Sequence, residues 1–182
     1  MIRYCITDPQ YYGSDTSTLH TTLLKLQKQD NFDFICFRDK SSKNFIDLAT
    51  TFIKTVEGKK TFLNGDYKLA HKLGFCGVHL TSTQFNDIKK AKELNLEVII
   101  STHTKVEISK ALAEGADYVT YSPIFATPNK GKPKGLEDLK VTTTTTSMKI
   151  IALGGITSEK QIQSVKECGV FGFASIRYFI DI

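Results

Sequence analysis

The sequence lacks the features that mark membrane-spanning, zinc-binding and disordered proteins. No apolar run approaches the roughly 18 residues that a membrane-crossing helix needs, and the N-terminus reaches the charged Arg3 and Asp8 too early for a signal peptide. The four cysteines form no CxxC pair and no cysteine–histidine cluster with zinc spacing. With 12 glycines and 4 prolines in 182 residues, the composition is that of a globular chain. We expect a soluble, cytoplasmic protein with reduced cysteines.

Neither sign of charge is in large excess. The 24 basic and 19 acidic side chains leave a net charge of +5, which suits an anionic ligand but is far from the concentrated basic stripe of a nucleic-acid-binding protein. The partners we expect are therefore small anionic molecules, with no nucleic acid and no membrane. No linker or shift in composition divides the chain, so residues 1–182 are predicted to form a single domain.

Eight short apolar runs alternate with segments of helical periodicity. The runs predict strands over Ile2–Thr7, Phe32–Phe37, Lys60–Leu63, Gly77–Leu80, Glu97–Thr102, Tyr118–Tyr121, Lys149–Leu153 and Phe171–Ile176. Because parallel strands need long crossover connections, this alternation predicts a parallel sheet covered by helices. Eight repeats favour an α/β fold of the (β/α)8 TIM-barrel type over a doubly wound open sheet. This length is near-minimal for such a barrel, so several helices must be short.

Local signals mark several helix ends. Residues that cap free backbone N–H groups predict helix starts at Ser14-Asp15-Thr16, Ser41-Ser42 and Thr157-Ser158-Glu159. The third helix, Asp66 to Leu73, is predicted to be only two turns long. The threonine run at Thr142–Thr146 predicts a frayed helix before the seventh strand, because threonine is a poor helix former.

The last two strands end in a candidate anion site, and barrel sites are built at the carboxyl ends of strands. Gly154-Gly155 open onto a helix start, so the backbone can approach a ligand closely and point free N–H groups at it. Arg177 follows the eighth strand, where phosphate sites of barrels commonly lie. We interpret these residues as a phosphate site, with a glycine turn beside a solvated arginine as the alternative.

Two basic segments could add to this site. Arg38-Asp39-Lys40 follows the second strand, and its two cations could hold a phosphate or diphosphate while Asp39 fixes one of the basic side chains. In the loop after the sixth strand, Lys130, Lys132 and Lys134 could close over an anion as a lid. The alternative for both segments is a solvated turn or loop.

His79 and His103 each stand at the end of a predicted strand. A histidine there could act as an acid, a base or a ligand, although it is at least as often a hydrogen-bonded structural residue. Neither histidine has a carboxylate at metal-ligand spacing. We regard both as candidate substrate-binding residues.

Eight short motifs occur in a fixed order along the chain. They are Tyr4-Cys5-Ile6-Thr7-Asp8, Phe37-Arg38-Asp39-Lys40, Leu63-Asn64, Gly77-Val78-His79-Leu80, Ser101-Thr102-His103-Thr104, Gly115-Ala116-Asp117-Tyr118-Val119, Ser122-Pro123-Ile124-Phe125-Ala126-Thr127 and Gly154-Gly155-Ile156-Thr157. Each motif is short, but the ordered set covers essentially the whole chain. It resembles the thiamine-phosphate synthase/TenI family, the thiamine monophosphate synthase superfamily.

The resemblance implies a (β/α)8 barrel that acts in thiamine biosynthesis. Thiamine-phosphate synthase joins a hydroxymethylpyrimidine diphosphate to a thiazole phosphate and releases diphosphate with magnesium. By position, the resemblance makes Arg38 and Lys40 diphosphate-site residues, and we take them with Lys130 as the candidate catalytic residues. The candidate substrate- and phosphate-binding residues, from the resemblance and from their places at strand ends, are Asn64, His79, Ser101, His103, Thr127, Asn129, Gly154, Gly155 and Arg177.

The magnesium-binding positions depart from the synthase pattern. Gly65 stands where the pattern has a magnesium-binding aspartate, although Asp66 is one residue further on. The run Thr81-Ser82-Thr83-Gln84 replaces the segment that carries the second metal carboxylate, and Cys36 replaces a glutamine. The resemblance therefore implies Mg²⁺, while these residues leave Asp66 as the remaining candidate ligand.

Other departures leave other activities open. Asn129 stands where the synthase usually has threonine, and Arg177 where it has serine. The TenI branch tautomerises the thiazole phosphate carboxylate with a histidine at the position of Pro123. The alternatives are therefore a TenI-like tautomerase, with His79 or His103 as the proton carrier, and a non-catalytic protein that binds thiazole or thiamine phosphate. Small barrels of this kind often form homodimers, although the sequence does not fix the oligomeric state.

Overall fold

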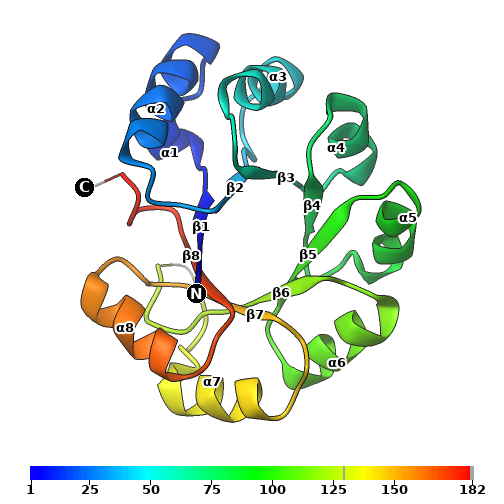
Figure 1. Ribbon diagram of the computed structural model, residues 1–182, viewed down its shortest axis with the longest axis vertical. Helices are drawn as coiled ribbons and strands as arrows, with labels where there is room; N and C mark the ends of the chain where they lie inside the picture. The colour runs from blue at the N-terminus through cyan, green and yellow to red at the C-terminus, as the bar shows by residue number, and fades with distance from the viewer. Residues whose placement is uncertain (129, 181–182) are drawn as a thin grey trace.

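The predicted strands form one closed parallel barrel (Figure 1). The computed structural model describes residues 1–128 and 130–180. Its strands are β1 (Ile2–Ile6), β2 (Phe34–Phe37), β3 (Lys60–Asn64), β4 (Gly77–Leu80), β5 (Glu97–Thr102), β6 (Tyr118–Tyr121), β7 (Ile150–Leu153) and β8 (Gly172–Ser175). Each pairs in parallel with the next, and β8 pairs with β1. The (β/α)8 barrel is therefore confirmed, and the open sheet is not formed.

Helices surround the barrel as an outer ring (Figure 1). They are α1 (Pro9–Tyr12), α2 (Thr16–Gln29), α3 (Phe45–Thr55), α4 (Tyr67–Leu73), α5 (Ile88–Glu93), α6 (Lys105–Glu114), α7 (Gly135–Thr144) and α8 (Glu159–Glu167), with a 3₁₀ turn η1 (Phe85–Asp87) before α5. After β8, the chain passes between α8 and α2, where the ring of Phe179 packs against that of Phe32. As expected for a near-minimal barrel, several helices are short.

Two of the three predicted helix starts are correct, and one is wrong. Asp15 and Ser158 cap α2 and α8 through their side-chain oxygens. The helix expected from Ser41-Ser42 begins only at Phe45. The reason is local: the backbone N–H groups of Ser41 and Ser42 both donate to the Asp39 carboxylate at 2.9 Å, which forms a turn that delays the helix.

The threonine run forms the end of α7 and the residues beyond it. The hydroxyls of Thr142 and Thr144 donate to backbone carbonyls four residues earlier, at 2.7 and 3.1 Å. Such bonds compete with the helical pattern, and α7 ends at Thr144, within the run.

Alternate residues of the strands fill the barrel interior, because successive side chains of a strand point to opposite faces. The interior cluster consists of Tyr4, Ile6, Phe34, Cys36, Phe62, Ile99, Tyr118, Ile151 and Ala174. Asn64 lies two residues after Phe62 on β3, and Ser101 lies two residues after Ile99 on β5. The two-residue period therefore directs these polar side chains into the carboxyl end of the barrel, above its apolar layers.

The aromatic filling of the interior depends on a small residue. A Cβ atom at Gly77 would lie 2.6 Å from the ring of Phe62 and 2.3 Å from the carbonyl oxygen of Glu97. Because Gly77 has none, Phe62 fits beside Tyr4, whose ring it meets edge-on at a centroid distance of 5.8 Å. The interior is thus a packed core below the polar end.

All four cysteines are free thiols, and Cys76 alone among them is exposed. Cys5 packs outward against the helices, whereas Cys36 belongs to the barrel interior. Burial raises the pKa of both thiols to about 12. They therefore behave as small apolar side chains, as the strand-like surroundings predict.

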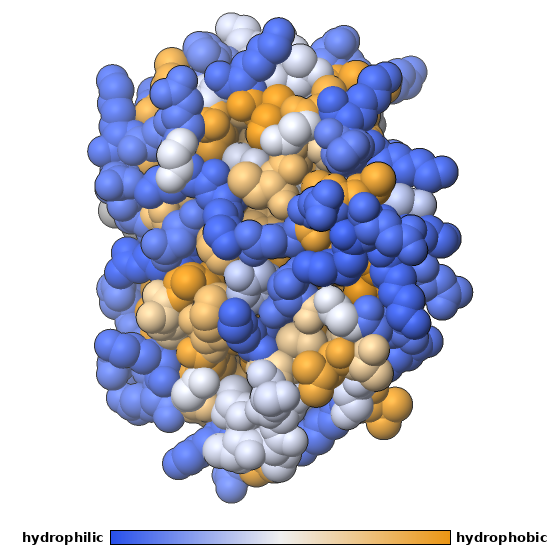
Figure 2. Space-filling view, turned by 45° about the vertical axis from the view of Figure 1, so that its right-hand side comes forward, coloured by the Kyte–Doolittle hydropathy of each residue, from blue (hydrophilic) through white to orange (hydrophobic). Residues whose placement is uncertain are grey.

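On the face shown in Figure 2, polar and charged side chains cover much of the surface, with apolar residues in patches between them. The exposed large apolar side chains are Met1, Tyr11, Leu24, Ile46, Val106, Leu112 and Val141. Only Val106 and Leu112 among these share an element, α6. Among the described residues, no helix combines the length and apolar character that crossing a membrane requires. A homodimer stays a prediction.

Candidate active site

A cavity of about 300 Å³ opens at the carboxyl ends of the strands. Every strand or its following loop contributes to it, and the lining residues are Ile6, Arg38, Lys40, Asn64, His79, Thr81, Ser82, Ser101, His103, Ser122, Pro123, Thr127, Lys130, Leu153, Gly154, Gly155, Ile156, Thr157, Ala174, Ser175, Ile176 and Arg177. All candidate residues except Asn129 and Asp66 therefore meet in one place. Asn129 lies outside the described residues.

Arg38 is positioned by a residue from the neighbouring strand end. Its Nη1 donates to Asp8 Oδ2 at 2.8 Å, and both side chains are about a quarter exposed. The expectation that Asp39 fixes a basic side chain is not met for Arg38: the Asp39 carboxylate accepts instead from Ser41 and Ser42. Asp39 is thus part of the turn, and Asp8 is the partner that orients Arg38.

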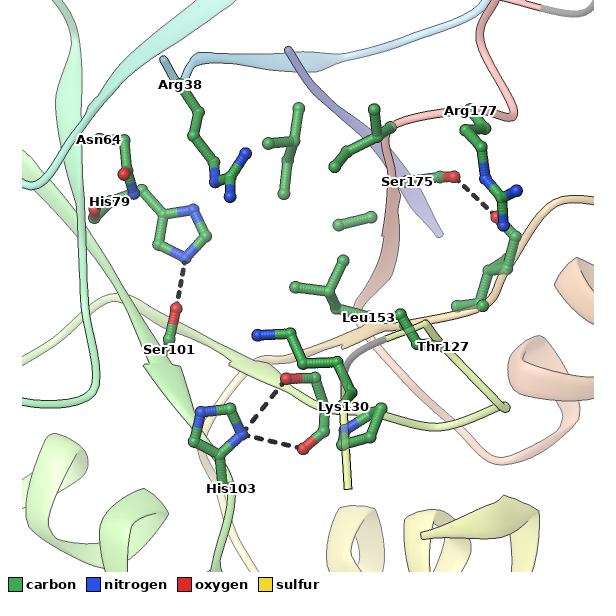
Figure 3. A pocket seen from close by; sticks show the side chains of 18 of the residues that line it. Arg38, Asn64, His79, Ser101, His103, Thr127, Lys130, Leu153, Ser175 and Arg177 are labelled. Carbon is green, nitrogen blue, oxygen red and sulfur yellow. Dashed lines mark hydrogen bonds between the residues drawn. The ribbon is translucent and has the colours of Figure 1, made fainter. Parts of the chain in front are cut away.

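His79 lies at the polar end of the barrel interior and is only 3% exposed. Its Nδ1 is 3.0 Å from the Tyr4 hydroxyl. Its Nε2 is 3.1 Å from Ser101 Oγ, a contact marked in Figure 3. Burial, reinforced by the charge of Arg38, lowers the pKa of His79 to about 3. The ring is therefore neutral at physiological pH, where it connects the core tyrosine to a cavity serine.

Asn64 fixes the adjacent strand end. Its Nδ2 donates to the backbone oxygen of His79 at 3.0 Å, and the N–H of Gly65 donates to the same oxygen at 2.9 Å. Two donors from the end of β3 thus hold the end of β4. Asn64 therefore supports the backbone that carries His79, in addition to lining the cavity.

His103 is held from two sides at the end of β5. Its Nδ1 lies 3.0 Å from the carbonyl oxygen of Ser122, which can only accept, so Nδ1 carries the proton in the neutral ring. Its backbone N–H donates to Glu107 Oε2, a member of the capping box of α6. In the neutral ring, Nε2 is consequently the nitrogen that can accept a proton.

The lysine-rich loop contributes one of its three lysines to the cavity. Lys130 lines the cavity, and its side chain extends toward the side that carries Arg38 and Ser101 (Figure 3). Lys134 is not part of a lid: its ammonium donates to the backbone oxygen of His103 and lies 4.8 Å from the ring centroid of Tyr121. Lys132 is exposed and does not line the cavity. The predicted three-lysine lid thus reduces to Lys130.

Thr127 also lines the cavity, next to the base of this loop. Its hydroxyl donates to the carbonyl of Phe125 at 3.0 Å, and its own carbonyl accepts from the N–H of Lys130 at 3.2 Å. These bonds lie at the start of the loop that carries Lys130.

Gly154 and Gly155 pack against the loop after β6. Both have positive φ angles, of 104° and 69°. A Cβ atom would lie 2.8 Å from Pro123 Cα at the first position and 2.6 Å from the carbonyl oxygen of Ala126 at the second. Glycine is thus required at both positions by the close approach of the loop after β6 as well as by the backbone angles.

Arg177 stands on the side of the cavity opposite Arg38 (Figure 3). The hydrogen bonds and ion pairs among the described residues include none from its guanidinium, and none from the backbone N–H of Gly155. Both residues line the cavity. An anion can therefore be bound here by a backbone N–H and a cation together.

The cavity is strongly positive. Arg38, Lys40, Lys130 and Arg177 line it, and among the described residues no aspartate or glutamate does. Asp8, bonded to Arg38, is the acidic side chain that compensates part of this charge. The cavity therefore favours anionic ligands.

The cavity residues do not fit the magnesium site that the resemblance implies, because magnesium prefers carboxylate ligands. Asp66 does not line the cavity; its carboxylate accepts from the N–H of Leu69 at 2.9 Å and caps α4. Within residues 1–128 and 130–180, no three His, Cys, Asp or Glu side chains form a group that could hold a metal ion.

Two residues that shape the site have no strong signal in the sequence. Asp8 is visible as a strand-end residue, but nothing in the sequence assigns it to Arg38, which lies 30 positions away. Gln84 bonds to Gly65, 19 positions earlier. Both interactions join different strand ends, so they depend on the folded barrel.

A closed (β/α)8 barrel with a cationic cavity at the carboxyl ends of its strands belongs to the class of barrels that bind small phosphorylated ligands. Comparison with known proteins gives the family: the TMP-TENI family, described as thiamine monophosphate synthase, matches residues 3–179, and the chain belongs to it. The family membership and the place in thiamine biosynthesis that the motifs predict are thereby confirmed.

Individual relatives agree with this membership. The Aquifex aeolicus (strain VF5) protein named "Putative thiamine-phosphate synthase 2" is 31% identical over 186 residues, covering 98% of this chain and 97% of its own. Thiamine-phosphate synthase of Methanoculleus marisnigri is 30% identical over 182 residues, covering 95% and 84%. A solved thiamine phosphate pyrophosphorylase from Pyrococcus furiosus covers 96% of this chain and 85% of its own, with a TM-score of 0.78 at 22% identity. That structure supports the fold.

Proposed function

We propose that the chain is a transferase that joins a hydroxymethylpyrimidine diphosphate to a thiazole phosphate, giving thiamine phosphate and diphosphate. The observation that carries this proposal is the presence of cationic groups on opposite sides of one cavity (Figure 3). Arg38, Lys40 and Lys130 form one group, and Arg177 with the N–H of Gly155 forms the other. Two phosphorylated substrates can thus be bound with their reacting ends between the groups.

In the proposed reaction, the bond between the pyrimidine methylene carbon and the diphosphate oxygen breaks, and its electron pair leaves with the oxygen. Arg38, Lys40 and Lys130 stabilise the negative charge that develops on the departing diphosphate. The thiazole nitrogen then donates its lone pair to the methylene cation and forms the new carbon–nitrogen bond. The atoms and charges balance without any further reactant.

The neutral side chains between the two groups position the pyrimidine. Ser101 Oγ borders the cavity and is held by His79, which is in turn held by Tyr4. Because the pKa of His79 is about 3, the imidazolium form is scarce at neutral pH and His79 serves as an orienting group. Apolar Ile6, Leu153 and Ile176 also line the cavity and limit access of water to the cation.

The test is the coupling reaction itself. Purified protein incubated with both substrates is expected to form thiamine phosphate, and Lys130→Ala is expected to lower kcat by about tenfold or more, because a charge that stabilises the leaving group is lost. Lys140→Ala, on the exposed side of α7, is the matched control and should keep the parent rate. Failure of the parent protein to form thiamine phosphate above background refutes the proposal.

A tautomerase of the TenI type is the second candidate, and His103 favours it. Pro123 has no ionisable side chain, but the His103 ring bonds to the carbonyl of the preceding Ser122 and lines the same cavity. Its Nε2 could accept and return a proton. This activity would be established instead if the protein isomerises thiazole phosphate carboxylate, if His103→Gln abolishes that isomerisation, and if the protein forms no thiamine phosphate in the coupling assay. Ligand-dependent stabilisation without either reaction would establish a binding protein.

A further inference from the structure

We propose that the cavity binds the diphosphate group of its ligand without a divalent cation, and that the Gln84 side-chain amide joins the two loops where a metal would otherwise lie. This inference rests on the proposed function, since it takes the diphosphate substrate as the ligand. It concerns the two segments, at Gly65 and at Thr81–Gln84, whose metal carboxylates are replaced.

The amide of Gln84 connects the ends of β3 and β4. Its Nε2 donates to the carbonyl oxygen of Gly65 at 2.7 Å. Its Oε1 accepts from the N–H of Thr81 at 3.0 Å and from the Thr81 hydroxyl at 2.9 Å. Thr81 lines the cavity and Gln84 does not, so Gln84 holds a cavity residue from outside the cavity.

The amide NH₂ group also lies between two oxygen acceptors. Besides the Gly65 carbonyl, Asp87 Oδ2 is 3.4 Å from Gln84 Nε2. A carbonyl and a carboxylate oxygen facing one point are the kind of ligands that magnesium takes. Here a neutral donor group occupies that point and satisfies both oxygens by hydrogen bonds. Asp87 is further neutralised by Lys90, at 3.0 Å.

The charge on the cavity side leads to the same inference. Arg38, Lys40, Lys130 and Arg177 line the cavity, and no carboxylate from residues 1–128 or 130–180 lines it. A divalent cation added there would meet repulsion from these side chains and find no anionic protein ligand. The same side chains can take over its role, because arginine and lysine bind phosphate oxygens directly by charge-assisted hydrogen bonds.

Calorimetric titration with inorganic diphosphate tests this directly. In EDTA, we expect binding at least as tight as in millimolar Mg²⁺, because complexation by Mg²⁺ reduces the negative charge of the anion. Lys130→Ala should weaken this binding about tenfold, which ties it to the cavity, while Lys140→Ala should not change it. A parent protein that needs Mg²⁺ for binding, or that binds no diphosphate in either buffer, overturns the proposal.

Variants of Gln84 test the positioning role. Gln84→Ala should weaken binding of diphosphate in EDTA several-fold, and Mg²⁺ should not restore it. Gln84→Glu places a carboxylate beside the Gly65 carbonyl and Asp87, so Mg²⁺ should raise the melting temperature of this variant and leave that of the parent unchanged. Thr21→Glu, at an exposed position of α2 with no acidic residue three or four positions away, is the control for a new carboxylate. If Gln84→Ala binds like the parent, Gln84 has no positioning role.

The outcomes separate this inference from the proposed function. Coupling activity is measured on the same preparation with Mg²⁺ and with EDTA. Metal-free diphosphate binding without thiamine phosphate formation leaves the binding inference standing and refutes the synthase. Coupling that requires Mg²⁺ supports the synthase and refutes the binding inference.

Discussion

Asp8 and Arg38, from the ends of two adjacent strands, form an ion pair at 2.8 Å on the wall of the cavity. Asp8 uses its two oxygens differently: Oδ2 holds Arg38, whereas Oδ1 accepts from the N–H of Gln10 at 3.2 Å and caps α1. One carboxylate thus connects the start of a helix to a cation of the site.

The two roles of Asp8 can be separated by substitution. Asp8→Asn keeps an N-cap acceptor but removes the charge that orients Arg38, so kcat/KM for coupling should fall about fivefold, or roughly 1 kcal/mol, with little change in stability. Asp8→Ala should lose a further ~1 kcal/mol of unfolding free energy with the cap. Steady-state kinetics and urea unfolding check this, and an Asn variant as active as the parent would contradict it.

His79 should make folding stability sensitive to mild acid. Its pKa is about 3 in the folded protein and 6.5 when unperturbed, so the unfolded chain binds a proton in this window and the folded protein does not. Stability should therefore decrease as the pH falls from about 6.5 toward 3, with a limiting slope of ~1.4 kcal/mol per pH unit from this group.

Urea unfolding between pH 4 and pH 7 measures this dependence. His79→Gln should be less stable at neutral pH and should show a shallower slope, whereas His71→Gln, at an exposed position of α4, should keep the parent slope. An equal slope in the parent and His79→Gln would rule out His79 as the source.

Two glycines with nearly identical φ angles separate backbone strain from crowding. Gly155 has φ 69° and Gly58 has φ 68°, but an added Cβ meets the Ala126 carbonyl at 2.6 Å at the first and nothing within 4 Å at the second. Gly58→Ala should cost ~1 kcal/mol, from the backbone alone. Gly155→Ala should cost clearly more and weaken binding of phosphate. Equal losses would show that the loop after β6 yields to a methyl group.

The thiols should differ sharply in reactivity. Cys76 is exposed, whereas burial raises the pKa of Cys5 and Cys36 to about 12, which removes nearly all thiolate at neutral pH. Iodoacetamide followed by mass spectrometry should modify Cys76 first in the native protein, and all four cysteines in urea. Rapid native modification of Cys36 would indicate that the barrel interior opens.

The strands and the place of the site were predictable because each rests on a local pattern. A two-residue alternation of apolar side chains defines a strand, and the convergence of parallel strand ends brings Arg38, Ser101 and Arg177 to one cavity. Neither prediction depends on which side chains are in contact. The number and order of the strands, and the end of the barrel at which the cavity opens, therefore follow from the sequence, whereas the bounds of five strands differ from the predicted ones by one or two residues.

Side-chain partners were not predictable, because they join segments that only the folded barrel brings together. Asp39, adjacent to Arg38 in sequence, turns away to Ser41 and Ser42, while Asp8 from another strand end takes its place. Likewise, the buried ring of His79 is hydrogen-bonded to Tyr4, 75 positions away. The lowered pKa of His79 is therefore a property of the fold.

The pairing of β8 with β1 has a consequence for synthesis of the chain. Gly172 lies so close to Ile2 that an added Cβ would meet its side chain at 2.4 Å. Until residues 172–175 have left the ribosome, the nascent chain exposes the unpaired edge of β1 and lacks Arg177. An incomplete barrel therefore exposes a strand edge that can pair with other chains, and the pairing of β8 with β1 removes this edge.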